Sequence, residues 1–487
     1  MSAGHRVVVI GGGLAGIAAA LDCADAGADV TLLEVRRRLG GAVYSFERDG
    51  LQIDNGQHVF MRCCTTYRAL LERLGSERSV SVQRRLSVPV LSPGRRMALL
   101  ARNALPAPLH MAGALARYHH LTVSQRIGAA RAALALARMD ARCEGLDELS
   151  FGDWLGGRGQ GPDAVAALWD VIVRPTLNLP ASKASLALGA FVFRTALLSD
   201  TDAGDIGFHV APLSATIGEP AERALRRAGV DVRLGWRAER LERTATGLEV
   251  HGRGGRGGED EEDRGERGAV AGESREGEGW SADVAIVALP HNRAGGLIER
   301  LLGETAHRLA ALGSSPIVNL HLVYDRQVCE QPFAAGVGTP VQYLFDRTAA
   351  AGVPLDCQYL AVSLSAAERE MAMSVDALRE LYLPALEELL PRARGATVER
   401  FLVTREHAAT FRAAPGVAAL RAAARTTVPG LVLAGTWTDT GWPATLEGAV
   451  LSGHNAALQA LQTLDVGTRG RSAASASTAT AASVDAL

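Results

Sequence analysis

The stretch VVVIGGGLAGIAAA, residues 7–20, decides the fold of this chain. Its first four residues are a continuous apolar run, typical of a strand buried in a parallel sheet, and the residues after Gly13 have helical spacing. Between them, Gly11 permits a tight turn, Gly13 lets the backbone approach a pyrophosphate, and Gly16 lets the helix pack closely on the strand. The start of the helix offers free N–H groups and a partial positive charge to phosphates. The stretch therefore predicts a dinucleotide site in a doubly wound α/β domain.

A carboxylate completes this motif. The run DVTLLE, residues 29–34, reads as the second strand and ends at Glu34, which lies 18 residues after Gly16. A carboxylate at this position accepts hydrogen bonds from the ribose hydroxyls of an adenosine. We therefore expect Glu34 to bind the adenosine half of the dinucleotide.

Bulk composition limits the class of protein. The 487 residues are 47% hydrophobic and 21% charged, which is typical of a globular chain of two or three domains. The net charge of −2 gives no reason to expect a nucleic-acid partner. The six cysteines show no CxxC spacing, which favours a reducing compartment and no metal site. No apolar run reaches ~18 residues, and the N-terminal run is too short for a signal peptide, so we expect a cytoplasmic protein.

A second glycine pair indicates which dinucleotide is bound. The segment EVRRRLGGAVYSFERDGLQIDNGQHVF, residues 34–60, carries Gly40 and Gly41 shortly after Glu34. It resembles the extended fingerprint of the flavin-containing amine oxidase and carotenoid desaturase superfamily. That resemblance implies FAD as the cofactor, with Arg36 and the glycine pair beside it. One position departs from the superfamily, because Ala42 stands where an arginine is usual.

The C-terminal stretch GLVLAGTWTDTGWPATLEGAVLSGHNAA, residues 430–457, resembles the flavin motif of the same superfamily. There a strand ends in Ala-Gly, a loop passes the flavin ring, and a helix starts at the pyrimidine edge of the ring. Gly435 and Gly441 suit a backbone that approaches a flat cofactor, and Pro443 suits a helix start. Thr436 replaces the acidic residue usual in relatives and offers a weaker hydrogen bond to the cofactor.

The resemblance and the motif together imply a set of FAD-binding residues, held by non-covalent contacts because no attachment motif is present. Ala238 is included as the main-chain contact to adenine. The expected residues are Gly11, Gly13, Leu14, Ala15, Gly16, Glu34, Arg36, Gly40, Gly41, Ala238, Gly435, Thr436, Pro443, Ala444 and Thr445.

Other stretches resemble a narrower group within the superfamily, the hydroxysqualene dehydroxylases. They are DNGQHVF (54–60), LPAPLHMAGALARYHHLTVSQR (105–126), RPTLNLPASKASL (174–186), SPIVNLHLVYDR (315–326) and AGTWTDTGWPATLEGAV (434–450). The resemblance implies a reduction in which reduced FAD delivers hydride to an isoprenoid allylic alcohol, and the hydroxyl leaves as water. It also implies a long-chain isoprenoid substrate and contact with other enzymes of squalene biosynthesis.

This reaction needs a group that helps the hydroxyl to leave. The candidates are Asp54, Gln57 and His58 in the first of these stretches, and Asp439 in the last. His58 is the first choice, because its ordinary pKa of ~6.5 suits proton donation near neutrality. A purely structural role, as a backbone partner or a turn residue, stays open for His58 and for Asp439. Trp437 and Trp442 either wall the flavin cavity or belong to the core.

Three other functions remain possible. Amine oxidases place a lysine on the strand that matches residues 315–325. This chain has Asn319 there and only 5% aromatic residues, so amine oxidation is disfavoured. A carotenoid or phytoene desaturase would share FAD and an apolar substrate but run in the oxidative direction. A flavoprotein-like subunit without catalysis would have lost FAD binding. The departures from the superfamily at Ala42 and Thr436 leave this possibility open.

The expected architecture is a Rossmann-like, doubly wound FAD-binding domain with an inserted α+β substrate domain, as in amine oxidases. We assign residues 1–75, 205–298 and 415–465 to the FAD domain, and 76–204 and 299–414 to the substrate domain. The Gly-rich and charged residues 252–279 are expected to be a disordered insert, as is the Ser- and Ala-rich tail 466–487. Residues 95–142 read as helices.

The segment 94–121 suggests how the protein meets an apolar substrate. It is apolar with interleaved arginines, a pattern that suits a membrane interface at the inner face of the cell membrane, although helices packed on the substrate domain would fit it equally. Replacing Leu99, Leu100 and Leu105 by glutamate is then expected to weaken membrane pelleting.

Overall fold

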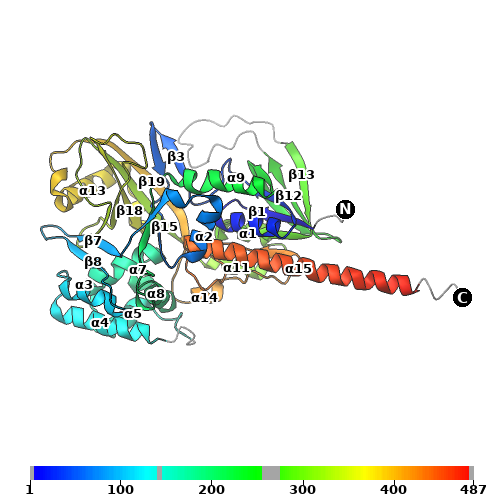
Figure 1. Cartoon of the computed structure of the whole chain (residues 1–487), viewed down its shortest axis with the longest axis horizontal. Coiled ribbons are helices and arrows are strands. Elements are labelled where there is room, and N and C mark those ends of the chain that lie inside the picture. The colour runs from blue at the N-terminus through cyan, green and yellow to red at the C-terminus, as the bar shows by residue number, and fades with distance from the viewer. Residues whose placement is uncertain (1–4, 140–144, 255–274, 482–487) are drawn as a thin grey trace.

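The computed structural model describes residues 5–139, 145–254 and 275–481 (Figure 1). Its first sheet is parallel and has the strand order β10-β2-β1-β14-β20. The strands are β1 (Arg6–Ile10), β2 (Asp29–Glu34), β10 (Asp231–Leu234), β14 (Val284–Val287) and β20 (Leu431–Leu433). The predicted doubly wound α/β fold is confirmed, since strands far apart in the sequence lie side by side.

The apolar run of β1 explains why both faces of this sheet are covered. Val7 and Val9 belong to one hydrophobic cluster and Val8 and Ile10 to another, because successive side chains of a strand point to opposite faces. Helices cover the first face, namely α1 (Leu14–Asp25), α2 (Thr65–Leu74), α9 (Glu219–Arg227) and α15 (Leu446–Ala481). The second face carries α10 (His291–Ile298), α11 (Gly303–Ala311) and a sheet of β11 (Trp236–Arg243), β12 (Leu248–Gly254) and β13 (Arg275–Ala282).

A second, seven-stranded sheet has the order β19-β15-β18-β17-β16-β7-β8 and is antiparallel apart from the pair β16 and β7. Its strands are β7 (Ser87–Leu91), β8 (Ala98–Ala101), β15 (Ser314–Tyr324), β16 (Phe333–Gly336), β17 (Tyr343–Asp346), β18 (Gln358–Ser365) and β19 (Val398–Phe411). One face packs against α13 (Val375–Leu389).

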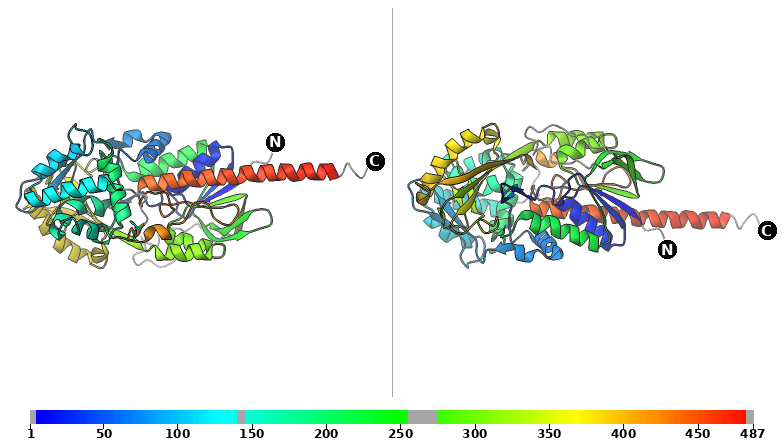
Figure 2. Two further views of the ribbon diagram at one scale, coloured as in Figure 1. Left: turned by 90° about the horizontal axis from the view of Figure 1, so that it is seen from below. Right: turned by 90° about the horizontal axis from the view of Figure 1, so that it is seen from above.

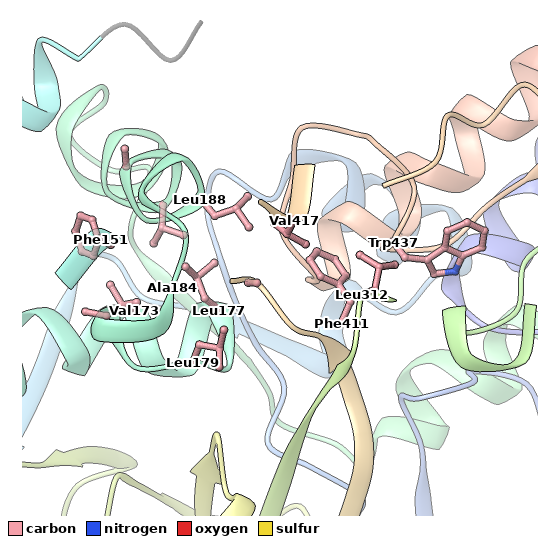
Figure 3. Packing of buried hydrophobic residues seen from close by; sticks show 14 of the residues in the cluster. Phe151, Val173, Leu177, Leu179, Ala184, Leu188, Leu312, Phe411, Val417 and Trp437 are labelled. Atoms are coloured by element: carbon pink, nitrogen blue, oxygen red, sulfur yellow. The ribbon is translucent and has the colours of Figure 1, made fainter. Parts of the chain in front are cut away.

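A group of helices lies near the other face of this sheet. They are α3 (Ala112–Arg117), α4 (Val123–Ala137), α5 (Phe151–Gly156), α6 (Pro162–Ala164), α7 (Asp170–Leu177) and α8 (Leu186–Phe193). Their apolar core includes Phe151 and Leu177 and runs on to Val417 and Trp437 near the parallel sheet (Figure 3). The two halves of the protein therefore share one continuous core.

Short elements join the two sheets. The hairpin of β3 (Ser45–Arg48) and β4 (Leu51–Asp54) follows the glycine pair. A three-stranded sheet of β5 (Val59–Met61), β9 (Ile206–His209) and β6 (Val80–Val82) comes next. Short helices α12 (Glu368–Met371) and α14 (Val417–Leu420) complete the fold.

Three expectations about local structure are wrong. Residues 98–101 form strand β8 instead of a helix, and Leu100 is buried in the core. Residues 252–254 and 275–279, expected to be disordered, extend β12 and β13, because backbone pairing does not need apolar side chains; residues 255–274 lie outside the described part. The tail continues α15 to Ala481, in line with its many alanines, and projects beyond the body (Figure 2).

Candidate active site

Two glycine turns pack backbone to backbone at the start of α1. The N–H of Gly40 donates to the carbonyl of Gly12 at 2.9 Å, and Gly13 and Gly40 form an isolated parallel β-bridge. A Cβ on Gly41 would lie 2.8 Å from the Cα of Gly13, so only glycine fits there. No side chain caps α1, whose first N–H groups stay open to an anion. The cradle therefore fits a diphosphate.

Glu34 lies beside this cradle. Its Oε2 accepts from the N–H of Gly12 at 2.6 Å and its Oε1 from the N–H of Arg36 at 2.8 Å. The side chain is 6% exposed, and burial raises the pKa of the carboxyl. The N–H of Gly235 donates to the carbonyl of Arg36 at 3.1 Å, which brings the start of β11, with Ala238, to the same edge. The arrangement fits the adenosine half of a dinucleotide, because the carboxylate oxygens keep lone pairs for ribose hydroxyls.

The C-terminal loop enters the site from β20. Gly435 has a φ of +133°, and its N–H donates to Ser452 Oγ at 2.9 Å. Trp437 is buried, and its Nε1 donates to the carbonyl of Leu289 at 2.8 Å, so it is a core residue. Trp442 is half-buried and lies edge-on to Phe191. The backbone after Gly435 and the half-buried residues before α15 are therefore the surfaces left for a flat ring.

Arg421, which sequence reasoning missed, holds this loop in place. Its Nη2 donates to the carbonyl of Thr438 at 2.5 Å and lies 3.2 Å from the carbonyl of Thr436. Burial lowers the pKa of this guanidinium, and nearby Asp439 partly opposes that effect. A buried cation bonded to loop carbonyls fixes the path of the backbone, since each donor must keep its acceptor.

Glu447 links the start of α15 to α2. Its two carboxylate oxygens accept from the N–H of Thr66 at 3.0 Å and of Tyr67 at 2.7 Å. The side chain is buried, so it acts as an N-terminal cap that another helix supplies. The position of α15 is thereby tied to the segment 54–67.

A cavity of about 440 Å³ lies between this segment and the seven-stranded sheet. Its size falls in the range of small-molecule pockets. Phe208, Phe333 and Phe345 form an apolar wall, with ring centroids 6.1–6.3 Å apart in two neighbouring pairs. Leu355 lines the cavity too and is 89% exposed, so the cavity opens to solvent there.

Three of the four proposed catalytic residues line this cavity. They are Asp54, Gln57 and His58. Asp54 pairs with Arg347 at 2.6 Å and accepts from Ser45 Oγ at 2.6 Å, so its carboxylate has structural partners. Asp439 does not line the cavity; it lies on an exposed turn, where its Oδ1 accepts from the N–H of Gly441 at 3.4 Å.

His58 is the titratable side chain best placed in the cavity. Its ring interacts with the backbone of Ala42, the residue after the glycine pair. Burial lowers the pKa of the imidazole, while the charge of Asp54 and the interaction with the Ala42 backbone oppose that shift. The ring therefore lies where the cavity meets the segment that leads from the cofactor cradle.

A buried chain of hydrogen bonds fixes the backbone of His58. The Nδ1 of His209 is 2.9 Å from the carbonyl of His58, and its Nε2 is 2.7 Å from the hydroxyl of Tyr67. Burial lowers the pKa of His209 to about 3, so the ring is neutral. Because the carbonyl can only accept, Nδ1 carries the proton and the Tyr67 hydroxyl donates to Nε2. His209 was missed because it is 151 residues from His58 in the sequence.

Replacing Tyr67 by phenylalanine tests this chain. The change leaves the buried Nε2 of His209 without a donor, which is expected to lower the free energy of unfolding by about 1–3 kcal/mol. Urea denaturation measures the effect. Tyr324→Phe is the matched control, since that buried tyrosine makes no hydroxyl hydrogen bond with a described residue. Equal stability of both variants would contradict a stabilising hydrogen bond between Tyr67 and His209.

Asn319 is the residue that the sequence comparison predicts at the position of an amine-oxidase lysine. It is fully buried, and its Nδ2 donates to the carbonyl of Asn55 at 3.0 Å. The Nδ2 of Asn55 in turn donates to the carbonyl of Ala42 at 3.0 Å. Asn319 therefore ties β15 to the segment between the glycine pair and His58, as a structural residue.

The arrangement brings both ends of the chain to one site. The cradle, Glu34 and the C-terminal loop flank the segment from Ala42 to His58, and the fit to a flavin dinucleotide rests on the uncapped α1 and the tightly apposed glycines. Within the described residues, no group of three His, Cys, Asp or Glu side chains is placed to hold a metal ion.

Comparison with known proteins gives the family. The family model described as flavin-containing amine oxidoreductase matches residues 14–461. A hydroxysqualene dehydroxylase of Sinorhizobium fredii is 28% identical, covering 94% of this chain and 98% of the relative. A zeta-carotene desaturase of Arabidopsis thaliana is 24% identical, covering 93% and 84%. The structure of cyclohexylamine oxidase from Brevibacterium oxydans superposes with a TM-score of 0.69 at 18% identity, covering 95% and 100%.

Proposed function

This chain belongs to the flavin-containing amine oxidoreductase family, and from that premise we propose that it removes the hydroxyl group of hydroxysqualene reductively to give squalene. The protein is an FAD-dependent oxidoreductase. The finer assignment is supported by the hydroxysqualene dehydroxylase relative, which aligns over nearly the full length of both chains. The proposed reaction would belong to hopanoid and isoprenoid biosynthesis.

The observation that carries the proposal is the cavity that joins an apolar wall to His58. Phe208, Phe333 and Phe345 offer the apolar surface that a hydrocarbon chain needs, and His58 offers a proton at the inner side. An amine substrate would instead need a partner for its positive charge. The carboxylates that line the cavity already have partners, since Asp54 pairs with Arg347, Glu330 pairs with Arg392, and Asp346 accepts from Thr348 and Gln358.

The chemistry divides between the cofactor and the chain. When bound, reduced FAD supplies the hydride, and the carbon–oxygen bond of the allylic alcohol breaks. The imidazolium of His58 gives its proton to the departing oxygen, so that water leaves instead of hydroxide. His209 and Tyr67 hold the His58 backbone, and the phenylalanines exclude water from the rest of the substrate.

A carotenoid or phytoene desaturase is the alternative, and the zeta-carotene desaturase relative supports it. Both reactions use FAD and a long apolar substrate, but the desaturase removes two hydrogens and reduces the flavin. The direction of electron flow therefore separates the two functions.

The test supplies purified holoprotein with a reductant and hydroxysqualene, and separately supplies oxidised holoprotein with phytoene or zeta-carotene. Chromatography of the extracted lipids measures the products. Squalene from the first reaction alone is the expected result. A desaturated product from the second, with no squalene from the first, would establish the alternative.

We also propose that the enzyme works in the cytoplasm, at the inner face of the cell membrane, where its substrate dissolves. Contact with other enzymes of squalene biosynthesis is part of the same proposal, since an apolar product must pass between active sites without entering water. Co-purification of the next enzyme with the tagged protein would support it.

A further inference from the structure

Positive charge is concentrated in one part of the chain. Residues 78–139 contain ten arginines and no aspartate, glutamate or lysine, whereas the remainder has 41 Lys and Arg against 53 Asp and Glu. We call residues 78–139 the basic lobe; besides β6 it contains β7, β8, α3 and α4, and these four cluster at one end of the molecule (Figure 1). An anionic surface would attract this lobe and repel the rest, so the field orients the protein.

The basic lobe also exposes apolar side chains. Of the 14 large hydrophobic residues exposed in the described part of the chain, seven belong to it. They are Met97, Leu99, Leu105, Leu109, Val123, Ile127 and Leu134. Scattered exposed apolar residues are ordinary, but this concentration within 62 residues marks an interaction surface.

Helix α4 shows how charge and apolar surface combine. Five exposed residues in α4 and at its C-cap recur at helical spacing, so that at 100° per residue they fall within an arc of about 80°. This outer stripe consists of Val123, Ile127, Arg131, Leu134 and Arg138. The opposite side of α4 packs on the core through Ala129, Ala132 and Leu136.

The outer stripe has no partner within the described residues. Val123, Ile127 and Leu134 are 64%, 50% and 43% exposed. Neither Arg131 nor Arg138 forms an ion pair with a residue in the ranges 5–139, 145–254 and 275–481. An outward stripe of three apolar residues and two arginines has the composition of an interfacial helix, with the arginines at headgroup level and the apolar side chains below them.

We propose that the outer stripe of α4 docks the basic lobe on the surface of an anionic lipid bilayer. The charge fits acidic headgroups, and the apolar side chains reach the acyl boundary. A second copy docked symmetrically would place the arginines of two stripes together, which is unfavourable. None of the helices in the described part of the chain has the length and apolarity to cross a bilayer. The inference rests on charge and exposure, independently of the reaction.

The experiment measures flotation of the FAD-loaded protein with vesicles of phosphatidylglycerol and phosphatidylcholine, and with vesicles of phosphatidylcholine alone. The wild type is expected to bind the anionic vesicles, with binding weakened in high salt. The triple change Val123→Gln, Ile127→Gln and Leu134→Gln is expected to lower the partition coefficient about tenfold or more. The matched control is Leu458→Gln on α15, where the leucine is 54% exposed and outside the basic lobe.

A second variant separates charge from apolar contact. Arg131→Gln with Arg138→Gln is expected to weaken binding to anionic vesicles and to reduce its salt dependence. Flavin absorbance and circular dichroism verify that each variant is folded. Absence of wild-type binding at low salt, or equal binding by the triple variant, would overturn the proposal. Two further results would overturn it. One is a change of oligomeric state in the triple variant without lipid; the other is an oligonucleotide that binds the wild type in competition with the vesicles and no longer binds the triple variant. None of these readouts depends on turnover, so they leave the proposed reaction to its own test.

Discussion

A Gly41→Val protein is expected to purify without flavin colour. Gly41 has a φ of +59°, which costs a β-branched residue about 1–3 kcal/mol, and its Cβ would meet the Cα of Gly13 at 2.8 Å. The atoms nearest to this Cβ, the Cα and N of Gly13, belong to the backbone. The clash is therefore relieved only if the two glycine turns separate, and the diphosphate then loses its cradle. A strain of ~3 kcal/mol corresponds to a loss of FAD affinity of about a hundredfold.

Visible absorbance of the purified protein and titration of the apoprotein with FAD measure this effect. Gly50→Asn is the matched control, because Gly50 also has a positive φ, of +73°, but a Cβ there meets nothing within 4 Å. Asparagine tolerates that conformation, so FAD binding should be unchanged. A Gly41→Val protein that binds FAD like the wild type would show that the cofactor lies elsewhere.

His58→Gln is expected to lower kcat for the dehydroxylation by 10²–10³-fold while FAD still binds, since removal of a general acid costs about this much. KM should change little, because the imidazole interacts with the departing oxygen and does not bind the hydrocarbon chain of the substrate. Steady-state kinetics and flavin absorbance measure the two effects. His119→Gln, which changes an exposed histidine on the basic lobe, is the control.

The same residue sets the sign of the pH dependence. Burial lowers the pKa of His58 from its ordinary value, and only the imidazolium can give a proton to the leaving oxygen. The wild-type kcat is therefore expected to fall as pH rises, with a midpoint below ~6.5. A kcat that is constant across this range, or activity within threefold of the wild type in His58→Gln, would exclude His58 as the donor.

Local signals in the sequence predict the cofactor half of the site well. The glycine turn after an apolar strand predicts both the parallel sheet and the open helix start, because each depends on neighbouring residues. Glu34 lies at the end of β2 and faces the glycine turn, as expected. The Thr436 loop follows β20, the strand at the edge of the parallel sheet that pairs with β14. Their contacts with FAD stay predictions.

Long-range partners are what the sequence does not predict. β8 reads as part of a helix because it is rich in Ala and Leu, and only its pairing with β7 makes it a strand. Tyr67, His209 and Arg347 carry no local motif, and they act through neighbours that are distant in the chain. Leu100 and Leu99 are adjacent in sequence but point to opposite faces, which matters for the choice of membrane variants.

The domain division also stays a prediction, although the strands follow it. The five strands of the parallel sheet fall within 1–75, 205–298 and 415–465, and the seven of the other sheet within 76–204 and 299–414. The continuous core between the halves shows why a sequence boundary is hard to place, since apolar residues near Val417 and Trp437 pack with the helices of the other half.

The most direct measurement is an anaerobic titration of the photoreduced holoprotein with hydroxysqualene. The account predicts that the flavin is oxidised and that one squalene forms for each flavin, followed by absorbance and by chromatography of the extracted lipid. A flavin that stays reduced in the presence of excess hydroxysqualene, or that is oxidised without forming squalene, would contradict it.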